Sequence, residues 1–384
     1  MNYLETYQIW CREASAPETI KQQLAAMKDN EQEIKACFGA ELQFGTAGIR
    51  GIMGAGTNRL NVFTVRRTAQ GLAAWLCGTD LPKCCAIAYD SRHNSRFFAE
   101  LCAVALAEKD IEVHLYHELA PTPMLSYAVR ELNCGCGIVV SASHNAGAYN
   151  GIKCYGPDGC QMTDAPAKIV FEQISAIPYF VPAKRSFNEL LEAGKISYIP
   201  MELWNAYYDR VMQEGMNLDR IPGAKLNVVY TPLCGTGNKP VREVLKRLGV
   251  NTTVVAVQEK PDGDFKTCEY PNPETDAALN ESYRVAETAP CDLILGTDPD
   301  CDRVAIAVPV ENGFQKLTGN ELGCLLLDYI LMTRKQLGNL PEGAFAVRSI
   351  VSTALADRIC ETYGCQMHTV LTGFKWIGGE ILDY

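Results

Sequence analysis

Short apolar segments typical of strands alternate with helical segments along most of this chain, and no other sequence feature constrains the fold as strongly. The alternation begins near Val62 and resumes after Pro200. Strands separated by helices are joined by right-handed crossovers, which place the strands in one sheet and the helices on its faces. The sequence therefore predicts an α/β fold of consecutive three-layer αβα domains with mixed, largely parallel sheets. The predicted strands are 84–89, 111–116, 138–140, 152–155, 226–230, 253–257, 292–296, 304–308, 345–347 and 367–370.

The chain has 384 residues, which suits two to three domains because one domain usually takes about 100–200 residues. Residues near 196–201 are interpreted as a link between two α/β patterns, and a third pattern begins near Thr318. We therefore expect a first domain over 1–199, a second over 200–317 and part of a third over 318–384.

Charge and cysteine content disfavour several functional classes. The net charge is −10 and no basic run occurs, so no nucleic-acid partner is expected, because phosphate neutralisation needs clustered Lys and Arg. We expect neither a secretory signal nor a membrane span. The 17 cysteines include no C-x-x-C pair, so neither a zinc site nor a redox pair is predicted. They fit small buried residues in a reducing cytoplasm.

The stretch 135–159 combines a buried strand, a polar loop and a second short strand. Ser143 and His144 lie in the loop, directly after the predicted strand 138–140. Polar side chains at the end of a strand lie at the edge where open α/β sheets bind ligands. Both residues are therefore candidates for chemistry, although a serine beside a histidine, taken alone, more often marks a surface turn.

Two further loops contain arginines. Residues 44–61 include five glycines, which permit tight turns and close approach of the backbone to a ligand. Arg50 in this loop can bind a phosphate through its planar guanidinium. The loop lacks the G-K-[ST] ending of a P-loop, which argues against a kinase. Arg92, in Y-D-S-R after the strand 84–89, could bind an anion or shape its own loop, and we favour the supporting role.

Three aspartates alternate in D-P-D-C-D-R, residues 298–303. If this segment is extended, alternation points Asp298, Asp300 and Asp302 to one side. Converging carboxylates repel one another unless a cation holds them, and oxygen ligands suit Mg²⁺ or Ca²⁺. An EF-hand is excluded, because its sixth and twelfth positions need Gly and Glu where this sequence has Arg and Pro. A solvated turn is the simple alternative, which the flanking apolar strands disfavour.

Four motifs resemble those of the α-D-phosphohexomutase family in order and spacing, over essentially the whole chain. They are F-G-T-A-G-I-R-G at 44–51, S-A-S-H-N-A with N-G-I-K at 141–153, D-P-D-C-D-R at 298–303 and T-G-F-K at 372–375. Y-T-P-L-C-G-T-G at 230–237 is most similar to the phosphoglucomutase and phosphopentomutase branch. The sequence departs from the family at Ala146, where most members have proline, so we expect a somewhat looser loop.

The resemblance implies a role for each candidate residue. The serine would carry the phosphoryl group, the first arginine would contact it, and the histidine and lysines would serve proton transfers near the substrate. The implied catalytic set is Ser143, His144, Lys153, Arg50, Arg303 and Lys375. The implied Mg²⁺ ligands are Asp298, Asp300, Asp302 and, through its phosphate, Ser143.

The implied activity is that of a phosphoglucomutase, a cytoplasmic phosphoprotein that interconverts glucose 1-phosphate and glucose 6-phosphate. Glucose 1,6-bisphosphate would be both intermediate and activator, and a phosphosugar would be the substrate. Phosphopentomutase, phosphomannomutase and phosphoglucosamine mutase are the alternatives within the family. An aspartate-nucleophile phosphatase is a less favoured alternative. Its D-x-D-x-[TV] motif usually ends the first strand near the N-terminus, whereas here the motif lies at 300–304.

In the family, a sugar-recognition loop and a C-terminal domain with a phosphate loop come after the position of Tyr384. We therefore expect a partial domain III and no domain IV in this sequence. That expectation keeps a second class open: a non-catalytic protein that binds Mg²⁺ and anions. The oligomeric state is not indicated by the sequence.

Overall fold

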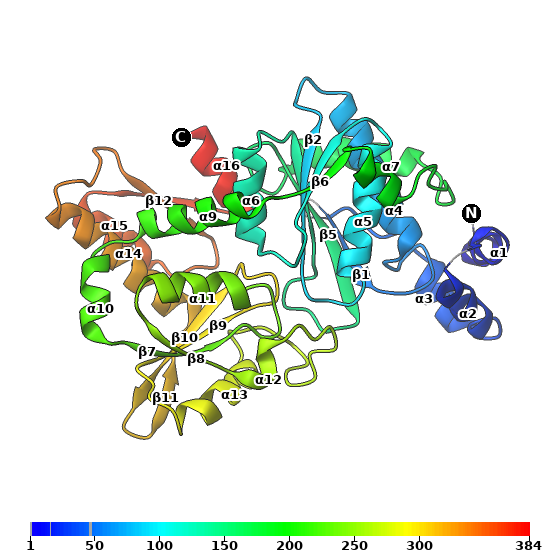
Figure 1. Cartoon of the computed structure of the whole chain (residues 1–384). Coiled ribbons are helices and arrows are strands. Elements are labelled where there is room, and N and C mark those ends of the chain that lie inside the picture. The colour runs from blue at the N-terminus through cyan, green and yellow to red at the C-terminus, as the bar shows by residue number, and fades with distance from the viewer. Residues whose placement is uncertain (1, 16, 46–47) are drawn as a thin grey trace. The chain divides into compact units, whose positions relative to one another are not determined.

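The computed structural model describes residues 2–15, 17–45 and 48–384, which form two compact units (Figure 1). The first unit covers Met1–Leu203 and the second covers Trp204–Tyr384. Each unit contains a mixed sheet of parallel and antiparallel strands covered by helices. The predicted class of consecutive αβα layers is therefore confirmed.

Three helices at the amino terminus form a small apolar cluster. The Trp10 ring packs edge-on against Phe38, with ring centroids 5.6 Å apart. Phe63 and Phe180, from later segments, complete this aromatic group. The three helices are α1 (Tyr3–Glu13), α2 (Glu18–Ala26) and α3 (Glu31–Phe38).

The sheet of the first unit has the order β1-β5-β4-β2-β3-β6. Strand β5 runs antiparallel to both of its neighbours, and the other pairs are parallel. Residues 196–198, which the sequence placed in a link, form the edge strand β6, because Ile196 is buried in the core and pairs with Val113 of β3. The strands are β1 (Gly48–Ile52), β2 (Cys84–Tyr89), β3 (Glu112–Leu115), β4 (Cys136–Val140), β5 (Tyr149–Tyr155) and β6 (Ile196–Tyr198).

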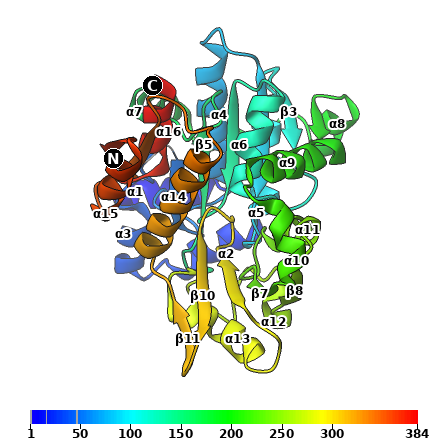
Figure 2. The same cartoon turned by 90° about the vertical axis from the view of Figure 1, so that its left-hand side faces the viewer.

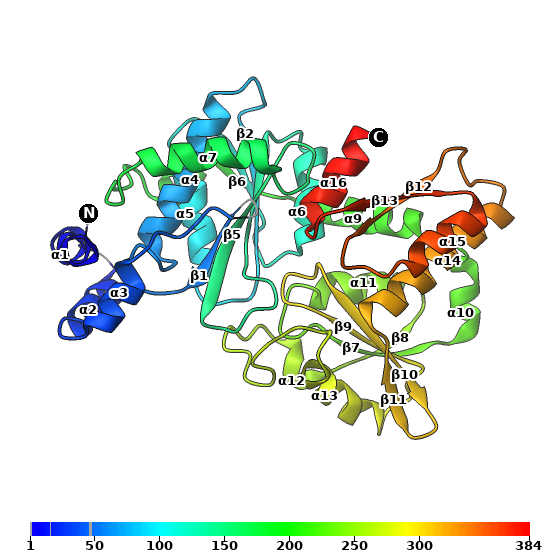
Figure 3. The ribbon, with the colours of Figure 1, turned by 180° about the vertical axis from the view of Figure 1, so that it is seen from behind.

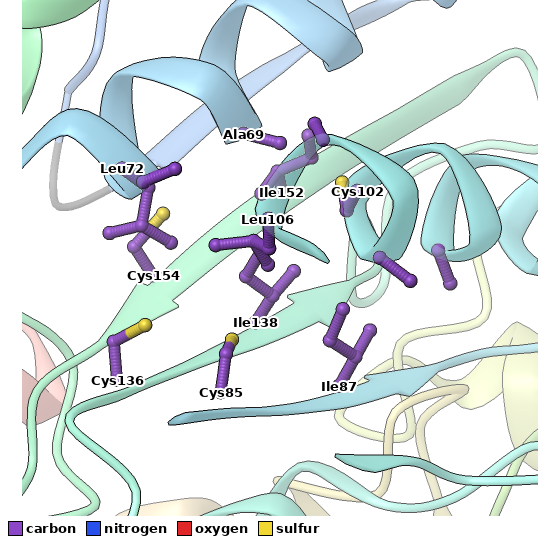
Figure 4. Packing of buried hydrophobic residues seen from close by; sticks show 14 of the residues in the cluster. Ala69, Leu72, Cys85, Ile87, Cys102, Leu106, Cys136, Ile138, Ile152 and Cys154 are labelled. Atoms are coloured by element: carbon purple, nitrogen blue, oxygen red, sulfur yellow. The ribbon is translucent and has the colours of Figure 1, made fainter. Parts of the chain in front are cut away.

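Helices cover both faces of this sheet (Figures 1 and 3). Helix α4 packs between α5 and α7 on one face, and α6 packs on β2 and β4 from the other. Figure 4 shows the core beneath α4 and α5, where Cys85, Cys136 and Cys154 of neighbouring strands point toward the helices. These thiols behave as small buried hydrophobes, as predicted. The helices are α4 (Val62–Cys77), α5 (Ser95–Ala107), α6 (Thr122–Glu131), α7 (Asp164–Ala176) and α8 (Phe187–Glu192).

The second unit contains a five-stranded sheet of order β11-β10-β9-β7-β8 (Figure 2). Strands β9, β7 and β8 are parallel, and β10 and β11 extend the sheet as antiparallel hairpins. The strands are β7 (Asn227–Thr231), β8 (Asn251–Val254), β9 (Leu293–Thr297), β10 (Val304–Val310) and β11 (Gly313–Lys316). The helices are α9 (Met201–Glu214), η1 (Leu218–Arg220), α10 (Ile221–Ala224), α11 (Asn238–Arg247), α12 (Ala256–Glu259) and α13 (Asp276–Ala286).

The last part of the second unit has two parallel strands and three helices. Leu331, Cys360 and Cys365 form its small apolar cluster. Within the described ranges, no helix is both long and apolar enough to cross a membrane. The elements are α14 (Gly319–Gln336), β12 (Phe345–Ser349), α15 (Leu355–Tyr363), β13 (Gln366–Val370) and α16 (Phe374–Asp383).

Candidate active site

Ser143 lies in the tight connection between β4 and β5, at the carboxyl end of β4. Its backbone adopts the left-handed conformation, with φ of 52°. A non-glycine residue persists there only when its surroundings hold it, because the conformation costs about 1–2 kcal/mol. The backbone N–H of Ser143 donates to Ser141 Oγ at 2.8 Å, which is one such restraint.

Arg92 is the main support of this connection. Its guanidinium donates to the carbonyl oxygens of Ser143 at 2.6 Å, Ala146 at 2.8 Å and Tyr149 at 3.1 Å, and also to that of Asn145. Three carbonyls of this loop and the carbonyl of the first residue of β5 therefore accept hydrogen bonds from a single buried side chain. The sequence interpretation assigned Arg92 to the support of its own loop, whereas these contacts show that it supports the Ser143 loop.

A buried polar network fixes Arg92 in turn. Asp90 Oδ2 lies 3.3 Å from the Arg92 Nε, and Asp90 Oδ1 accepts from the Ser95 hydroxyl at 2.7 Å. Asn150 Nδ2 donates to the Ser95 oxygen at 2.9 Å and to the His93 carbonyl at 3.0 Å. Burial raises the pKa of Asp90, and the Arg92 charge opposes that shift. The network ties the loop after β2 to β5, so the Ser143 loop is held from two strands.

Two of the predicted side chains lie on this loop. The His144 Nδ1 is 3.1 Å from the Ser143 Oγ, within hydrogen-bond distance. Arg50, on β1, donates from Nη1 to the Asn145 Oδ1 at 2.9 Å. Lys153 is buried on β5, opposite Val139 of β4. Ser143 and His144 are therefore in contact, and Arg50 is linked to their loop by its hydrogen bond to Asn145. Asn145 belongs to the S-A-S-H-N-A motif, but the sequence analysis did not identify it as a site residue.

The packing of β5 explains why the N-G-I-K motif has glycine at position 151. Gly151 lies opposite Arg50 in the β1–β5 pair. A Cβ on Gly151 would lie 2.7 Å from the carbonyl oxygen of Ile49 and 2.8 Å from that of Ser141. A side chain at this position would therefore push β1 away from the loop that carries Ser143.

The three aspartates lie in the turn between β9 and β10, which are antiparallel neighbours. The turn includes Cys301 with φ of 56°, so the expected extended segment is wrong. A tight turn brings the carboxylates together, and one oxygen from each of Asp298, Asp300 and Asp302 lies within 4.8 Å of the others. The Asp298 Oδ1 also accepts backbone N–H groups from Asp302 at 3.1 Å and Arg303 at 3.0 Å, which fixes its direction.

The electrostatics of this group fit a hard divalent cation. Asp298 and Asp300 are fully buried. Burial raises the pKa of Asp298 well above its ordinary value, and the charges of Asp300 and Asp302 raise it further. Clustered buried carboxylates are stable as anions only when a positive charge joins them. Three carboxylate oxygens are a donor set that suits Mg²⁺.

Two glycines allow the 232–237 loop to lie against the aspartate turn. The Thr236 N–H donates to the Pro299 carbonyl at 2.8 Å. A Cβ on Gly235 would lie 2.4 Å from the Pro299 Cα, and one on Gly237 would lie 2.6 Å from the Thr297 Oγ1. Sequence reasoning missed this supporting role, although the repeated glycine in G-T-G was a visible signal.

Arg303 and Lys375 belong to the second unit. The Arg303 guanidinium lies 3.6 Å from the Glu274 carboxylate and is partly exposed. Lys375, in the first turn of α16, is buried, and its Nζ lies 4.8 Å from the centre of the Trp376 ring. The roles implied for both residues, and for Ser143 as a metal ligand, stay predictions.

Comparisons with known proteins match three consecutive domains. Residues 41–179 match the phosphoglucomutase/phosphomannomutase alpha/beta/alpha domain I, 205–312 match domain II, and 318–384 match domain III. A phosphoglucomutase of Staphylococcus epidermidis is 39% identical over 344 residues, which are 88% of this chain and 61% of the relative. A phosphoglucomutase of Staphylococcus aureus is 36% identical over 366 residues, covering 92% of this chain and 63% of that protein. The chain thus spans about three fifths of the length of these curated relatives.

Solved structures agree with this result. A crystal structure of a Thermus thermophilus protein assigned to the phosphomannomutases matches with a TM-score of 0.74 and 25% identity, over 90% of this chain and 72% of that one. A phosphoglucomutase/phosphomannomutase family protein of Burkholderia thailandensis matches with a TM-score of 0.67 over 88% of this chain and 68% of its own. The second match, at 18% identity, shows the fold alone.

Proposed function

The chain belongs to the phosphoglucomutase/phosphomannomutase family, and on that premise we propose that it is a phosphoglucomutase-type phosphotransferase. Its substrates would be glucose 1-phosphate and glucose 6-phosphate, and glucose 1,6-bisphosphate would be the intermediate and activator. The observation that carries the proposal is the geometry of Ser143, whose Oγ lies 3.1 Å from the His144 Nδ1 in a loop fixed by Arg92. The name phosphoglucomutase of the relatives supports glucose over other sugars.

The proposed reaction has two transfers. In the first, the 6-hydroxyl oxygen of glucose 1-phosphate attacks the phosphorus on Ser143; the P–Oγ bond breaks, a P–O6 bond forms, and the hydroxyl proton passes to a base. In the second, the Ser143 Oγ attacks the phosphorus at C1 of the bisphosphate, the P–O1 bond breaks, and glucose 6-phosphate leaves. Each transfer moves a proton to or from the Ser143 Oγ. We assign that proton to His144, and its ring nitrogen within hydrogen-bond distance of Oγ supports the assignment.

Charge stabilisation would come from an arginine and a metal ion. Arg50 supplies a fixed positive charge beside the Ser143 loop. Asp298, Asp300 and Asp302 would hold Mg²⁺, which would supply positive charge to neutralise a transferred phosphoryl group. Lys153 and Lys375 are buried lysines, and we assign them to proton transfer or substrate contact. A cytoplasmic location and the lack of a nucleic-acid partner stay predictions from composition.

A coupled assay for glucose 6-phosphate tests the proposal. The parent protein and Ser143→Ala are compared with glucose 1-phosphate, Mg²⁺ and catalytic glucose 1,6-bisphosphate, while peptide mass spectrometry locates the phosphoryl group. We expect turnover and a phosphorylated Ser143 in the parent and neither in the variant. Faster turnover with mannose, ribose or glucosamine 1-phosphate would change the assigned sugar. Phosphorylation without turnover of any sugar would favour a non-catalytic phosphoprotein, and labelling that persists in Ser143→Ala would refute the assignment.

A further inference from the structure

A second group of metal-ligating side chains lies in the first unit, away from the serine loop. One donor atom from each of Cys84, His114 and Cys134 lies within 4.8 Å of the others. The Sγ atoms of Cys84 and Cys134 are 2.8 Å apart. Cys84 is the first residue of β2 and Cys134 comes two residues before β4, whereas Ser143 follows the carboxyl end of β4. The two groups therefore lie at opposite ends of the parallel strands of the same sheet.

The register of the sheet explains why these residues meet. Cys85 and Cys136 are paired neighbours that face the helix-covered core (Figure 4). Side chains alternate along a strand, so Cys84 points to the other face. His114 pairs with Ala86, two residues after Cys84, and so shares that face.

Gly135 lets the segment that carries Cys134 approach β2. The Gly135 N–H donates to the Cys84 carbonyl at 2.9 Å. A Cβ on Gly135 would lie 2.2 Å from the carbonyl oxygen of Pro82. Glycine at this position therefore permits the close contact that brings the two thiols together.

The imidazole of His114 is oriented from β6. The Ser197 hydroxyl lies 2.9 Å from the His114 Nδ1 and 3.5 Å from the Val113 carbonyl, to which it donates. In the tautomer that carries its proton on Nδ1, the imidazole donates to the serine oxygen and the Nε2 lone pair is available to a metal. A metal-binding histidine commonly has such a partner on its other ring nitrogen. The Nε2 lies 3.6 Å from the Glu112 carboxylate, so an oxygen donor is adjacent.

We propose that Cys84, His114 and Cys134 form a binding site for a soft divalent metal of the zinc class, with Glu112 as the neighbouring fourth donor. Thiolate and imidazole ligands select such metals over Mg²⁺. Zinc–sulfur bonds of about 2.3 Å at a tetrahedral angle place two sulfurs about 3.8 Å apart. Binding therefore separates the thiols by about 1 Å, and each thiol that coordinates releases its proton to solvent.

This site is distinct from the aspartate group in chemistry and in place. The aspartates offer oxygen atoms alone and belong to the second unit, whereas the new site offers two sulfurs and a nitrogen. Its ligands come from three separate segments. A search for C-x-x-C pairs therefore could not detect the site. The expectation of no zinc site rested on local spacing, and local spacing cannot report donors that meet only through the sheet.

Cobalt substitution tests the proposal on the reduced protein. Co²⁺ is titrated in the presence of excess Mg²⁺, which occupies the carboxylate site, and the thiolate-to-cobalt charge-transfer band is followed. We expect one equivalent of Co²⁺ to produce the band and Zn²⁺ to displace it. Cys84→Ser and Cys134→Ser should each reduce the band and weaken binding at least tenfold. Cys11→Ser, which removes an exposed thiol in α1, is the matched control and should bind as the parent does.

Ser197→Ala provides a variant that keeps every ligand. Loss of the partner of a metal-binding histidine typically weakens binding by about 10–100-fold, so the band should remain and the affinity should fall. Far-ultraviolet circular dichroism checks that each variant is folded, and elemental analysis of the parent after dialysis against Zn²⁺ measures stoichiometry without any substitution. A reduced parent that shows no charge-transfer band, or a band of equal strength in Cys84→Ser, would overturn the proposal. A Cys84–Cys134 disulfide that resists added reductant would also overturn it.

Discussion

The Arg92 Nη2 lies 2.6 Å from the carbonyl oxygen of Ser143, a residue 51 positions later in the chain. Both side chains of the Arg92–Asp90 pair are fully buried. The loop that presents the serine is therefore held by a desolvated guanidinium, and its conformation depends on a residue that we do not expect to contact substrate.

Replacement of Arg92 should unfold the serine loop rather than alter its chemistry. Arg92→Leu leaves the Asp90 carboxylate buried without its partner and removes donors from four carbonyls. Such a change typically costs about 3–5 kcal/mol, measurable by urea unfolding. Arg96→Leu, which removes the exposed ion pair between Arg96 and Glu100, should change the free energy of unfolding by no more than about 0.5 kcal/mol. Equal effects of the two substitutions would contradict this account.

Removal of one carboxylate should separate metal affinity from stability. Asp300→Asn reduces the repulsion within the aspartate group, so the metal-free variant should be at least as stable as the parent. Calorimetry should show Mg²⁺ binding weakened at least tenfold. Asp328→Asn, on the exposed face of α14, serves as the control and should bind Mg²⁺ normally. If Asp300→Asn binds Mg²⁺ with the parent's affinity, the group is not the metal site.

The stabilising effect of Mg²⁺ should grow with pH. The folded-state pKa of Asp298 is raised above its ordinary value of 3.8, so the folded, metal-free protein binds a proton that the unfolded chain has released. The contribution of Asp298 to the free energy of unfolding is therefore fully present below pH 3.8. It is lost as the pH rises toward the folded-state pKa. Because Mg²⁺ needs the ionised carboxylate, the rise in Tm on adding Mg²⁺ should be small in acid and large at neutral pH. A rise independent of pH would count against the assignment.

The contact between the 232–237 loop and the aspartate turn should not tolerate a methyl group. Gly235→Ala places a Cβ about where the Pro299 backbone lies, and such overpacking typically costs about 1–3 kcal/mol. The turn should shift, so Mg²⁺ affinity should fall together with stability. Gly223→Ala, where nothing lies within 4 Å of the added Cβ, is the matched control. Unchanged affinity in a destabilised Gly235→Ala would show that the loop supports the fold but not the metal ligands.

His144 should matter for transfer and not for folding. His144→Gln keeps a polar group near the Ser143 Oγ but removes the titrating nitrogen at 3.1 Å. General acid–base catalysis typically contributes about 10²–10⁴-fold to a rate, so phosphorylation of Ser143 by glucose 1,6-bisphosphate should slow by that range in rapid-quench measurements. The urea midpoint should stay that of the parent. A phosphorylation rate within twofold of the parent would remove His144 from the proton transfer.

Much of the fold is predictable from local pattern. The strand predicted over 84–89 coincides with β2 because its residues are apolar and flanked by turn residues. The strand predicted over 253–257 ends at Val254, and α12 begins at Ala256. Strand β6 was missed because three residues hold too little periodicity to be distinguished from a link; only its pairing with β3 reveals it.

The candidate site divides in the same way. Asp298, Asp300 and Asp302 were predicted to converge, and they do, but through a left-handed turn at Cys301 instead of an extended alternation. The contacts of Arg92 with the carbonyls of the Ser143 loop depend on tertiary neighbours that no spacing in the sequence encodes. Motif reading identified the residues, whereas the way in which they are held required the structure.

The order of strands in the first sheet has a consequence for synthesis on the ribosome. Its two outer strands, β1 and β6, are the first and the last of that sheet to be translated. Strand β1 can pair only with β5, about 100 residues later, and translation at about 5–20 residues per second delays that pairing by roughly 5–20 s. During this interval the nascent glycine-rich segment is an unpaired edge, so chaperone capture of this protein should concentrate on chains that end before Tyr149.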